Sequence, residues 1–250
     1  MKHLSQLTPA EVVLLTKPGA THNELLKLTF IDLLFKQVLK TYEVERRPHY
    51  RDKLKVYTYV SIGKNFETYT SLNHERVFLS SFVSDTSIEI LFSNLVKIAY
   101  QKSKALLYYK ADIYKTPTLQ KCFSQNIFQK LLYKYSITDY GAKLKKEVKE
   151  EIQIEANKLA NNSTLESQMV IDLIEKIGGN IFLLVAFDHE LFSRIDHEMG
   201  SIINRVNDNS GVGESGCAYM SFDDYSSSFD SSCSGDSGCS GGGCSGCGGD

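Results

Sequence analysis

Apolar residues recur with the 3.6-residue period of an α-helix along most of the first two hundred positions. Three of these stripes are Phe30, Leu33, Leu34, Val38 and Leu39; Leu91, Leu95, Ile98 and Ala99; and Leu119, Phe123, Ile127, Leu131 and Leu132. Three more are Leu144, Val148, Ile152, Ala156 and Leu159; Leu165, Met169, Leu173 and Ile177; and Leu184, Phe187, Leu191, Ile195, Met199 and Ile202. A stripe of this kind packs against a core, so the pattern predicts a mainly α fold.

Helix starts are marked by a hydroxyl residue followed three positions later by a carboxylate, which is the spacing of a capping box. The candidates are Thr21…Glu24, Thr29…Asp32, Thr86…Glu89 and Ser163…Glu166. Thr116-Pro117 is a fifth start, because proline suits the first helical position. We expect a helix to begin at each of these points.

Strand signals are confined to one region. Residues 55–62 are rich in β-branched and aromatic side chains, and Gly63-Lys64-Asn65 reads as a turn. A return strand is expected at 66–70, and 42–45 is expected to pair with the same ribbon. The sequence therefore predicts one small β-ribbon.

Helices followed by a ribbon give the element order of a winged helix. The chain divides into a winged-helix-like unit at 1–83, a second helical, winged-helix-like unit at 84–160, and C-terminal helices at 161–206. Residues 207–250 are expected to be a disordered tail.

Composition changes abruptly at Asn207. From there to Asp250 the chain has no Lys, Arg, Leu or Ile, and it holds 11 of the 17 glycines and five of the six cysteines. Such a segment cannot bury enough apolar surface to offset its ordering entropy. This segment carries seven acidic residues and no basic ones. The chain before it has 28 basic and 23 acidic residues, which is a formal charge of +5. That charge is mild for a nucleic-acid-binding domain.

The tail thiols leave three interpretations open. The residues Cys233, Cys239, Cys244 and Cys247 could bind zinc or copper(I), although only Cys244-Ser245-Gly246-Cys247 has the paired spacing of a zinc site. The Ser/Cys/Gly run also resembles the core of azole-type precursor peptides, whose Cys and Ser side chains are cyclised. Alternatively, the tail is a low-complexity extension with no single chemical task.

An acidic-aromatic segment precedes these thiols. Tyr219, Phe222, Tyr225 and Phe229 would share one face of a helix and lie among Asp223, Asp224 and Asp230. Such a helix could dock into a partner groove or onto the basic domain, unless the spacing is a chance pattern.

No catalytic motif is present, and we expect no enzymatic activity. Asp188-His189-Glu190 and Asp196-His197-Glu198 could hold a metal, but they lack the His-Glu-x-x-His spacing and also fit a solvated helix face. The single cysteine outside the tail, Cys122, lies on an apolar stripe and is expected to be a buried core thiol.

Nucleic-acid binding and membrane insertion are not expected. To read a DNA groove, the predicted helix at 30–39 would have only Lys36, Gln37 and the neighbouring Lys40. The basic stretch 46–51 is the better candidate for contact with phosphates. The longest apolar run, 181–187, is far too short to cross a bilayer, and the first residues do not read as a signal peptide. These features favour a cytoplasmic protein.

Leu7-Thr8-Pro9-Ala10-Glu11 and the tail from Gly211 resemble the two ends of a group of uncharacterised bacterial proteins with winged-helix-like helical segments. The resemblance implies no activity. We therefore expect a non-enzymatic interaction protein with a protein partner and a flexible Cys-rich tail. A precursor modified on its tail and a weak DNA-binding regulator are the alternatives.

Overall fold

The computed structural model describes residues 2–47, 49–51, 53–161, 172–173 and 176–184, together with Tyr225, Ser227 and Phe229. Its helices are α1 (Pro9–Thr16), α2 (His22–Phe35), α3 (Arg76–Leu79), α4 (Phe92–Lys102), α5 (Leu106–Tyr114), α6 (Ile127–Leu131), α7 (Asp139–Asn161) and α9 (Ile181–Leu184), with the 3-10 turns η1 (Asn73–Glu75) and η2 (Gly178–Asn180). Its strands are β1 (Leu39–Arg46), β2 (Lys55–Ile62), β3 (Ile90–Leu91), β4 (Phe123–Ser124) and β5 (Ser136–Ile137).

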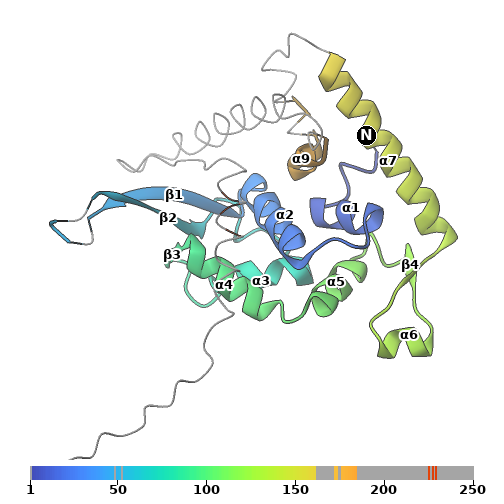
Figure 1. Cartoon of the computed structure of the whole chain (residues 1–250), viewed down its shortest axis with the longest axis horizontal. Helices are drawn as coiled ribbons and strands as arrows, with labels where there is room; N and C mark the ends of the chain where they lie inside the picture. Colours follow the sequence, from blue (N-terminus) through green and yellow to red (C-terminus); the bar gives the residue numbers. More distant parts are fainter. Residues whose placement is uncertain are drawn as a thin grey trace, which may run out of the picture.

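Helix α2 lies at the centre of the described residues, between α1, α9 and the layer formed by α3, α4 and α5 (Figure 1). It begins at the predicted capping box, where the Glu24 backbone N–H donates to the Thr21 hydroxyl at 3.2 Å. No residue of α2 is exposed, and most are buried. The predicted start at Thr29 is wrong, because Thr29 lies inside this helix and its hydroxyl donates to the Leu25 carbonyl at 2.9 Å.

The predicted ribbon is confirmed, with one change of partner. Strands β1 and β2 pair antiparallel from Leu39↔Ile62 to Arg46↔Lys55, as expected for 42–45. The expected return strand at 66–70 is wrong, because residues 64–68 form a turn and β3 pairs with β2 instead. At Gly63 a Cβ would lie 2.2 Å from the Gln37 carbonyl oxygen, so this close turn requires glycine.

Two other predicted helix starts are wrong. Helix α4 begins at Phe92 rather than after Thr86, because residues 90–91 continue the sheet as β3. After Thr116-Pro117 the chain makes only a turn before β4, so residues 119–132 do not form one helix. Leu119 is buried as expected, whereas Ile127 is exposed.

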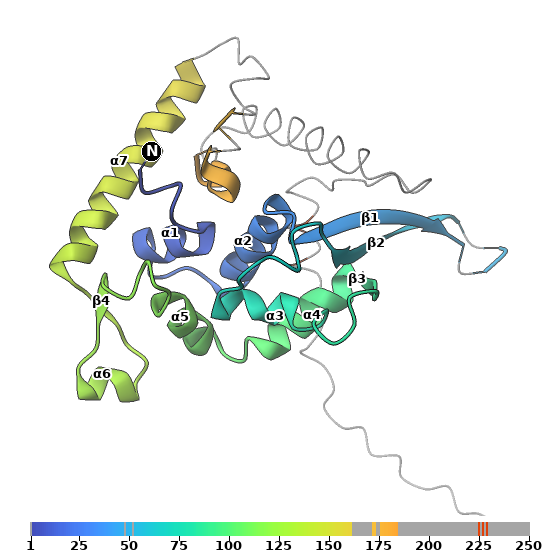
Figure 2. The same cartoon turned by 180° about the vertical axis from the view of Figure 1, so that it is seen from behind.

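Helix α7 follows the predicted stripe, with Leu144, Val148 and Leu159 buried. It runs along one edge of the described residues and packs against α1 (Figures 1 and 2). Its Glu151 carboxylate accepts hydrogen bonds from the backbone N–H groups of Lys2, His3 and Leu4 at 3.0 to 3.2 Å. A residue of α7 therefore fixes the start of the chain.

The mainly α prediction with a small antiparallel sheet is confirmed for the described residues. The winged-helix arrangement is not confirmed, and the domain boundaries stay predictions. In the two predicted C-terminal helices the structure describes residues 172–173 and 176–184, and Leu173, Ile177, Ile181 and Leu184 are buried. The predicted start at Ser163 and the remainder of both helices lie outside the described residues. No helix in the part of the chain that the structure describes is long and apolar enough to cross a membrane.

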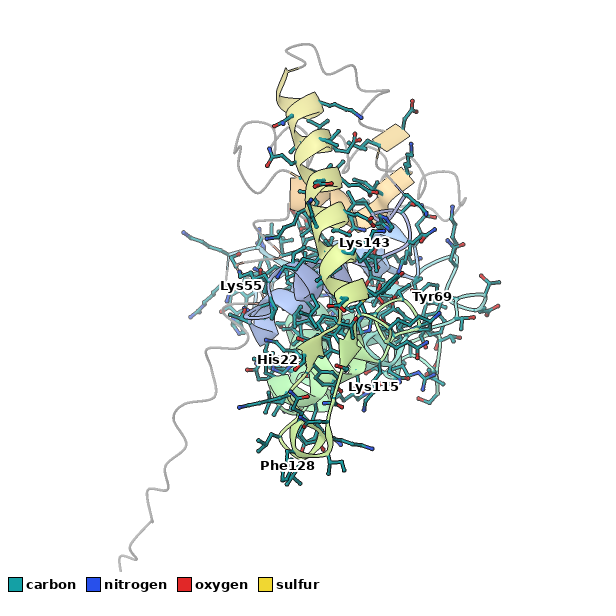
Figure 3. The ribbon with its side chains drawn as sticks, turned by 90° about the vertical axis from the view of Figure 1, so that its right-hand side faces the viewer. His22, Lys55, Tyr69, Lys115, Phe128 and Lys143 are labelled. Atoms are coloured by element: carbon teal, nitrogen blue, oxygen red, sulfur yellow. The ribbon has the colours of Figure 1, made fainter. Side chains whose placement is uncertain are left out.

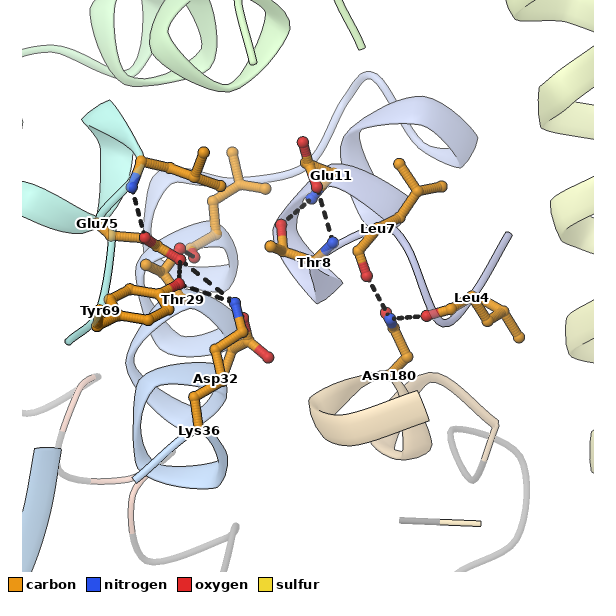
Figure 4. A network of polar contacts seen from close by, with 12 residues as sticks. Leu4, Leu7, Thr8, Glu11, Thr29, Asp32, Lys36, Tyr69, Glu75 and Asn180 are labelled. Carbon is orange, nitrogen blue, oxygen red and sulfur yellow. Dashed lines mark hydrogen bonds and ion pairs between the residues drawn. The ribbon is translucent and has the colours of Figure 1, made fainter. Parts of the chain in front are cut away.

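Asn180 joins η2 to the N-terminal segment. This buried side chain donates from Nδ2 to the carbonyl oxygens of Leu4 and Leu7, at 2.7 and 2.6 Å (Figure 4). The preceding Gly179 packs so closely that a Cβ would lie 2.9 Å from Pro9 Cγ. A single amide thus satisfies two carbonyls that the sequence places more than 170 positions away.

Asn180→Ala should lower the free energy of unfolding by about 2 to 4 kcal/mol, because two buried carbonyl groups lose their donor. Chemical denaturation measures the change. Asn94→Ala, at an exposed position of α4, is the matched control and should stay within about 0.5 kcal/mol of the unchanged protein. Equal stabilities of the two variants would contradict this role for Asn180.

Candidate interaction site

A short excursion of the chain between α5 and α7 projects from the body of the protein (Figures 1 and 2). We call residues 123–137 the α6 knob. Strands β4 and β5 form its stem through the pairs Phe123↔Ile137 and Ser124↔Ser136, and α6 forms its tip. The knob is thus an antiparallel hairpin whose connection is a helical turn.

Hydrogen bonds inside the knob fix the position of α6. Asn126 and Gln129 form a reciprocal capping box, with bonds of 2.8 and 3.0 Å. Gln129 Nε2 also donates to the Ser136 hydroxyl at 2.7 Å, and Gln125 Nε2 donates to the Lys134 carbonyl at 2.9 Å. Glutamine side chains therefore tie the tip to its own stem.

The base of the knob is anchored to the core. The Tyr114 ring of α5 contacts Phe123 and Tyr135, with centroid distances of 4.4 and 4.3 Å. At the start of α7, a Cβ on Gly141 would lie 2.2 Å from the Cys122 carbonyl oxygen. The predicted core thiol is confirmed, since Cys122 is fully buried. These contacts make the knob a fixed projection of the domain.

The outer face of α6 is apolar and exposed. The exposed fraction of the residue is 87% for Ile127, 79% for both Phe128 and Leu131, and 57% for Leu132, which directly follows α6. Phe128 lies at the tip of the α6 knob, away from the other helices (Figure 3). α6 has no buried residue at all. A contiguous apolar cluster of this kind marks an interaction surface more often than a lone exposed side chain does.

Positive charge surrounds this apolar face. The side chains of Lys121, Lys130 and Lys134 are exposed, and the sequence from 113 to 138 contains no acidic residue. An apolar centre with a charged rim is the usual composition of a protein-protein contact surface. The rim of this apolar face is therefore positively charged.

The same residues were predicted to be the buried stripe of a longer helix. Apolar periodicity reports which residues share a helix face and does not report whether another element covers that face. The Asn126…Gln129 spacing was the signal for a separate short helix, because it has the form of a capping box.

The ribbon formed by β1 and β2 is a second projection (Figures 1 and 2). Its tip is basic. Residues 46–55 contain five Arg and Lys residues against one acid. The Arg51 guanidinium lies 5.0 Å from the Tyr50 ring centroid, and Arg46 lies 5.5 Å from Tyr59. Arg46, Arg47, Tyr50 and Arg51, which belong to the stretch predicted to contact phosphate, are exposed.

A buried polar network joins the end of α2 to η1 (Figure 4). Lys36 Nζ lies 2.6 Å from Asp32 Oδ2 and 3.5 Å from Glu75 Oε1. The Tyr69 hydroxyl donates to Glu75 Oε1 at 2.7 Å and accepts from Lys36 at 3.0 Å. Removing Lys36 would leave two buried carboxyl groups without their cation.

Burial changes the protonation of this network. Burial raises the pKa of Asp32 to about 6, although the Lys36 charge opposes the shift. Burial also lowers the pKa of the adjacent His74 to about 3, and Lys36 acts in the same direction. Burial alone would lower the pKa of Lys36, but the Asp32 and Glu75 carboxylates raise it above its usual range. The network therefore consists of two buried carboxyl groups that share the single Lys36 ammonium.

A pocket of about 130 Å³ lies beside this network and is lined in part by Asn73, Asp112 and Lys115. It is smaller than the pockets that hold most small ligands. No cluster of three or more His, Cys, Asp or Glu side chains among the described residues could hold a metal ion. The network has the contacts of a structural element, and the two projections are the candidate sites.

The predicted metal ligands Cys233, Cys239, Cys244 and Cys247 lie outside the described residues. The two Asp-His-Glu tripeptides around His189 and His197 also lie outside them. Two residues of the acidic-aromatic segment, Tyr225 and Phe229, are described and fully buried.

The opposed pKa shifts predict opposite responses to acid in two variants. A histidine with a lowered folded pKa destabilises the fold as pH falls below about 6.5, whereas a carboxyl with a raised pKa stabilises it as pH falls from about 6 to about 4. In the unchanged protein the two effects largely cancel. When the pH is lowered from 7 to 4.5, the free energy of unfolding of His74→Gln should rise by about 2 kcal/mol relative to that of the unchanged chain. The free energy of unfolding of Asp32→Asn should fall by about 2 kcal/mol on the same comparison.

Denaturant unfolding of the three proteins across this pH range measures both effects. Parallel pH profiles for His74→Gln, Asp32→Asn and the unchanged chain would contradict the assigned pKa shifts.

The chain was compared with known proteins in three ways. No protein-family model matches it, and neither the curated proteins nor the solved structures give a significant match. The site geometry therefore supplies the argument for function.

Proposed function

We propose that the protein is a non-enzymatic interaction protein that binds a protein partner through the apolar face of the α6 knob. One observation carries the proposal: four large apolar side chains are exposed on a short helix whose own hydrogen bonds hold it away from the core. Exposing them opposes the hydrophobic effect, so a covering partner would recover that free energy.

The geometry also indicates the partner's chemistry. Phe128 and Leu131 project as adjacent anchors, which suits an apolar groove about one helical turn long. The exposed Lys130 and Lys134 would face the rim of that groove, so acidic residues there would add steering and specificity. Because the knob is already fixed, little conformational entropy would be lost on binding.

The cytoplasmic location, the likeness to bacterial proteins and the thiol chemistry of the tail remain part of this proposal. Zinc or copper(I) on Cys233, Cys239, Cys244 and Cys247 would make the tail a second functional element. Azole-type modification of the same residues is the alternative for that element.

The ribbon supports a second candidate function, weak binding of nucleic acid. Its exposed tip combines Arg46, Arg47 and Arg51 with the aromatic Tyr50, which suits contact with phosphates. A groove-reading helix is not available from α2, because that helix exposes no residue. Any binding through the ribbon would therefore be electrostatic and largely independent of base sequence.

Phe128→Asp and Leu131→Asp should each abolish capture of the partner, because a charge replaces an apolar anchor. Quantitative mass spectrometry of proteins retained from host extract by the tagged full chain measures the loss. Ile154→Asp is the matched control, since Ile154 is also apolar and 52% exposed but lies on α7.

A protein retained by the unchanged chain and by Ile154→Asp, and lost from both knob variants, is the expected result. Unfolding free energies of the knob variants should change by less than about 0.5 kcal/mol, because the replaced side chains are solvated. Identical retained proteins for all four chains would contradict the proposal.

For the second candidate, duplex DNA binding should weaken steeply between 50 and 200 mM salt. Arg47→Gln should lower the slope of log affinity against log salt by about 1, because each phosphate contact releases counterions. Fluorescence anisotropy with a labelled duplex measures both. An unchanged slope in Arg47→Gln, or no binding at 50 mM salt, would reject this function.

A further inference from the structure

Three phenylalanine rings from three different helices meet in one place in the core. Phe30 of α2 lies 5.0 Å from Phe92 of α4 and 5.5 Å from Phe78 of α3, measured between ring centroids. All three side chains are buried. We call these three residues, together with Thr41 of β1, the aromatic socket.

Two side chains from the far end of the chain occupy the aromatic socket. The Tyr225 ring lies 5.4 Å from Phe92 and 5.7 Å from Phe30, and both contacts are edge-on. The Phe229 ring lies 5.5 Å from Phe92, 5.9 Å from Phe30 and 6.4 Å from Phe78. Edge-on aromatic pairs at these distances add to the gain from burial alone.

A hydrogen bond makes the socket selective. The Tyr225 hydroxyl and Thr41 Oγ1 are 2.8 Å apart, and both residues are buried. A buried hydroxyl without a partner would be costly, so Thr41 favours tyrosine over phenylalanine at this position. The socket therefore distinguishes its two aromatic anchors.

The backbone of the described tail residues explains their spacing. Tyr225, Ser227 and Phe229 are helical, and the residues four apart share one helix face. Ser227, between them, is exposed. This arrangement is that of a helix laid into a groove with two anchors. It also fits the acidic-aromatic pattern that begins at Tyr219.

The contact joins residues that lie far apart in the sequence. Forty residues separate Leu184 from Tyr225, so bringing Tyr225 to the socket costs chain entropy. The Tyr225 and Phe229 rings cover Phe30, Phe78 and Phe92, and burial of these rings opposes that cost.

We propose that the aromatic socket is a docking site for a helical Tyr-x-x-x-Phe segment, and that its occupant is the segment of the same chain that carries Tyr225 and Phe229, held as a releasable clasp. In the sequence Cys233, Cys239, Cys244 and Cys247 follow Phe229, so the clasp would set the distance of these thiols from the domain. This inference is independent of the α6 knob.

The chain has no tryptophan, so one introduced indole reports on the socket without background. Phe229→Trp should emit at short wavelength, as a buried indole does, whereas the control Ser227→Trp should emit as a solvated one. A synthetic peptide with the sequence of residues 219–230 should shift the Phe229→Trp emission to long wavelength as it displaces the clasp. The same peptide with Tyr225→Ala and Phe229→Ala should have no effect.

Thr41→Val in the Phe229→Trp chain gives a second readout. Loss of the hydrogen bond to Tyr225 should lower the occupancy of the clasp and weaken peptide binding together, so the residual short-wavelength emission should decrease. Emission of Phe229→Trp identical to that of Ser227→Trp would overturn docking. Short-wavelength emission that saturating peptide cannot shift would show that these rings are permanent core residues and would overturn the releasable clasp.

The larger side chain of Phe229→Trp could fail to fit the socket, so hydrogen exchange is also measured on chains without tryptophan. Amides at 225–229 should exchange several-fold more slowly in the unchanged protein than in Tyr225→Ala. Equal exchange rates in the two proteins would also overturn the proposal.

Discussion

The burial of most of α2 is the constraint on which the rest of the described fold depends. This helix carries Asp32 into the interior and ends beside the half-buried Lys36, and a buried charge needs a partner. Glu75 and Tyr69 supply those partners, so η1 must lie against the end of α2. The same helix places Phe30 where α3 and α4 contribute Phe78 and Phe92. Charge compensation on one side of α2 and aromatic packing on another thus fix the surrounding elements.

Local signals in the sequence predicted the parts of the fold that depend on neighbours in the chain. The Thr21…Glu24 capping box, the ribbon at 55–62 and the stripe of α7 are all present, because caps, alternation and helical periodicity act over a few residues. Contacts between distant segments were not predictable in the same way. Asn180 binding to Leu4 and Leu7, and the pairing of Lys36 with Glu75, depend on the tertiary arrangement alone.

The candidate site shows the limit of periodicity most clearly. Leu119 and Ile127 belong to one apolar stripe in the sequence, yet the first is buried and the second is almost fully exposed. The stripe is interrupted by β4 and by the Asn126 cap, which turn the following helix away from the core. Residues that would have strengthened the core instead form the α6 knob. An apolar run that leaves the core despite its composition is a stronger indication of binding than exposed polar residues would be.

The core and the exposed projections occupy different parts of the described structure. The charges and aromatic rings around α2 lie in the domain with Leu39 and Val60 of the ribbon, while helix α6 and the basic tip of the ribbon project from it. Tyr225 and Phe229 fill the aromatic socket and belong to the segment that precedes the cysteines. On the proposed function, the domain would present the α6 knob as a fixed contact surface and hold the segment of Tyr225 and Phe229 as a second element.

The most direct test of this account is photocrosslinking in host cells from a benzoylphenylalanine placed at position 128, with position 154 as the control site. The account predicts a discrete adduct between the full chain and one protein from position 128, and none from position 154. Adducts of equal number and mass from both positions, or none from position 128, would contradict the assignment of the α6 knob as the recognition surface.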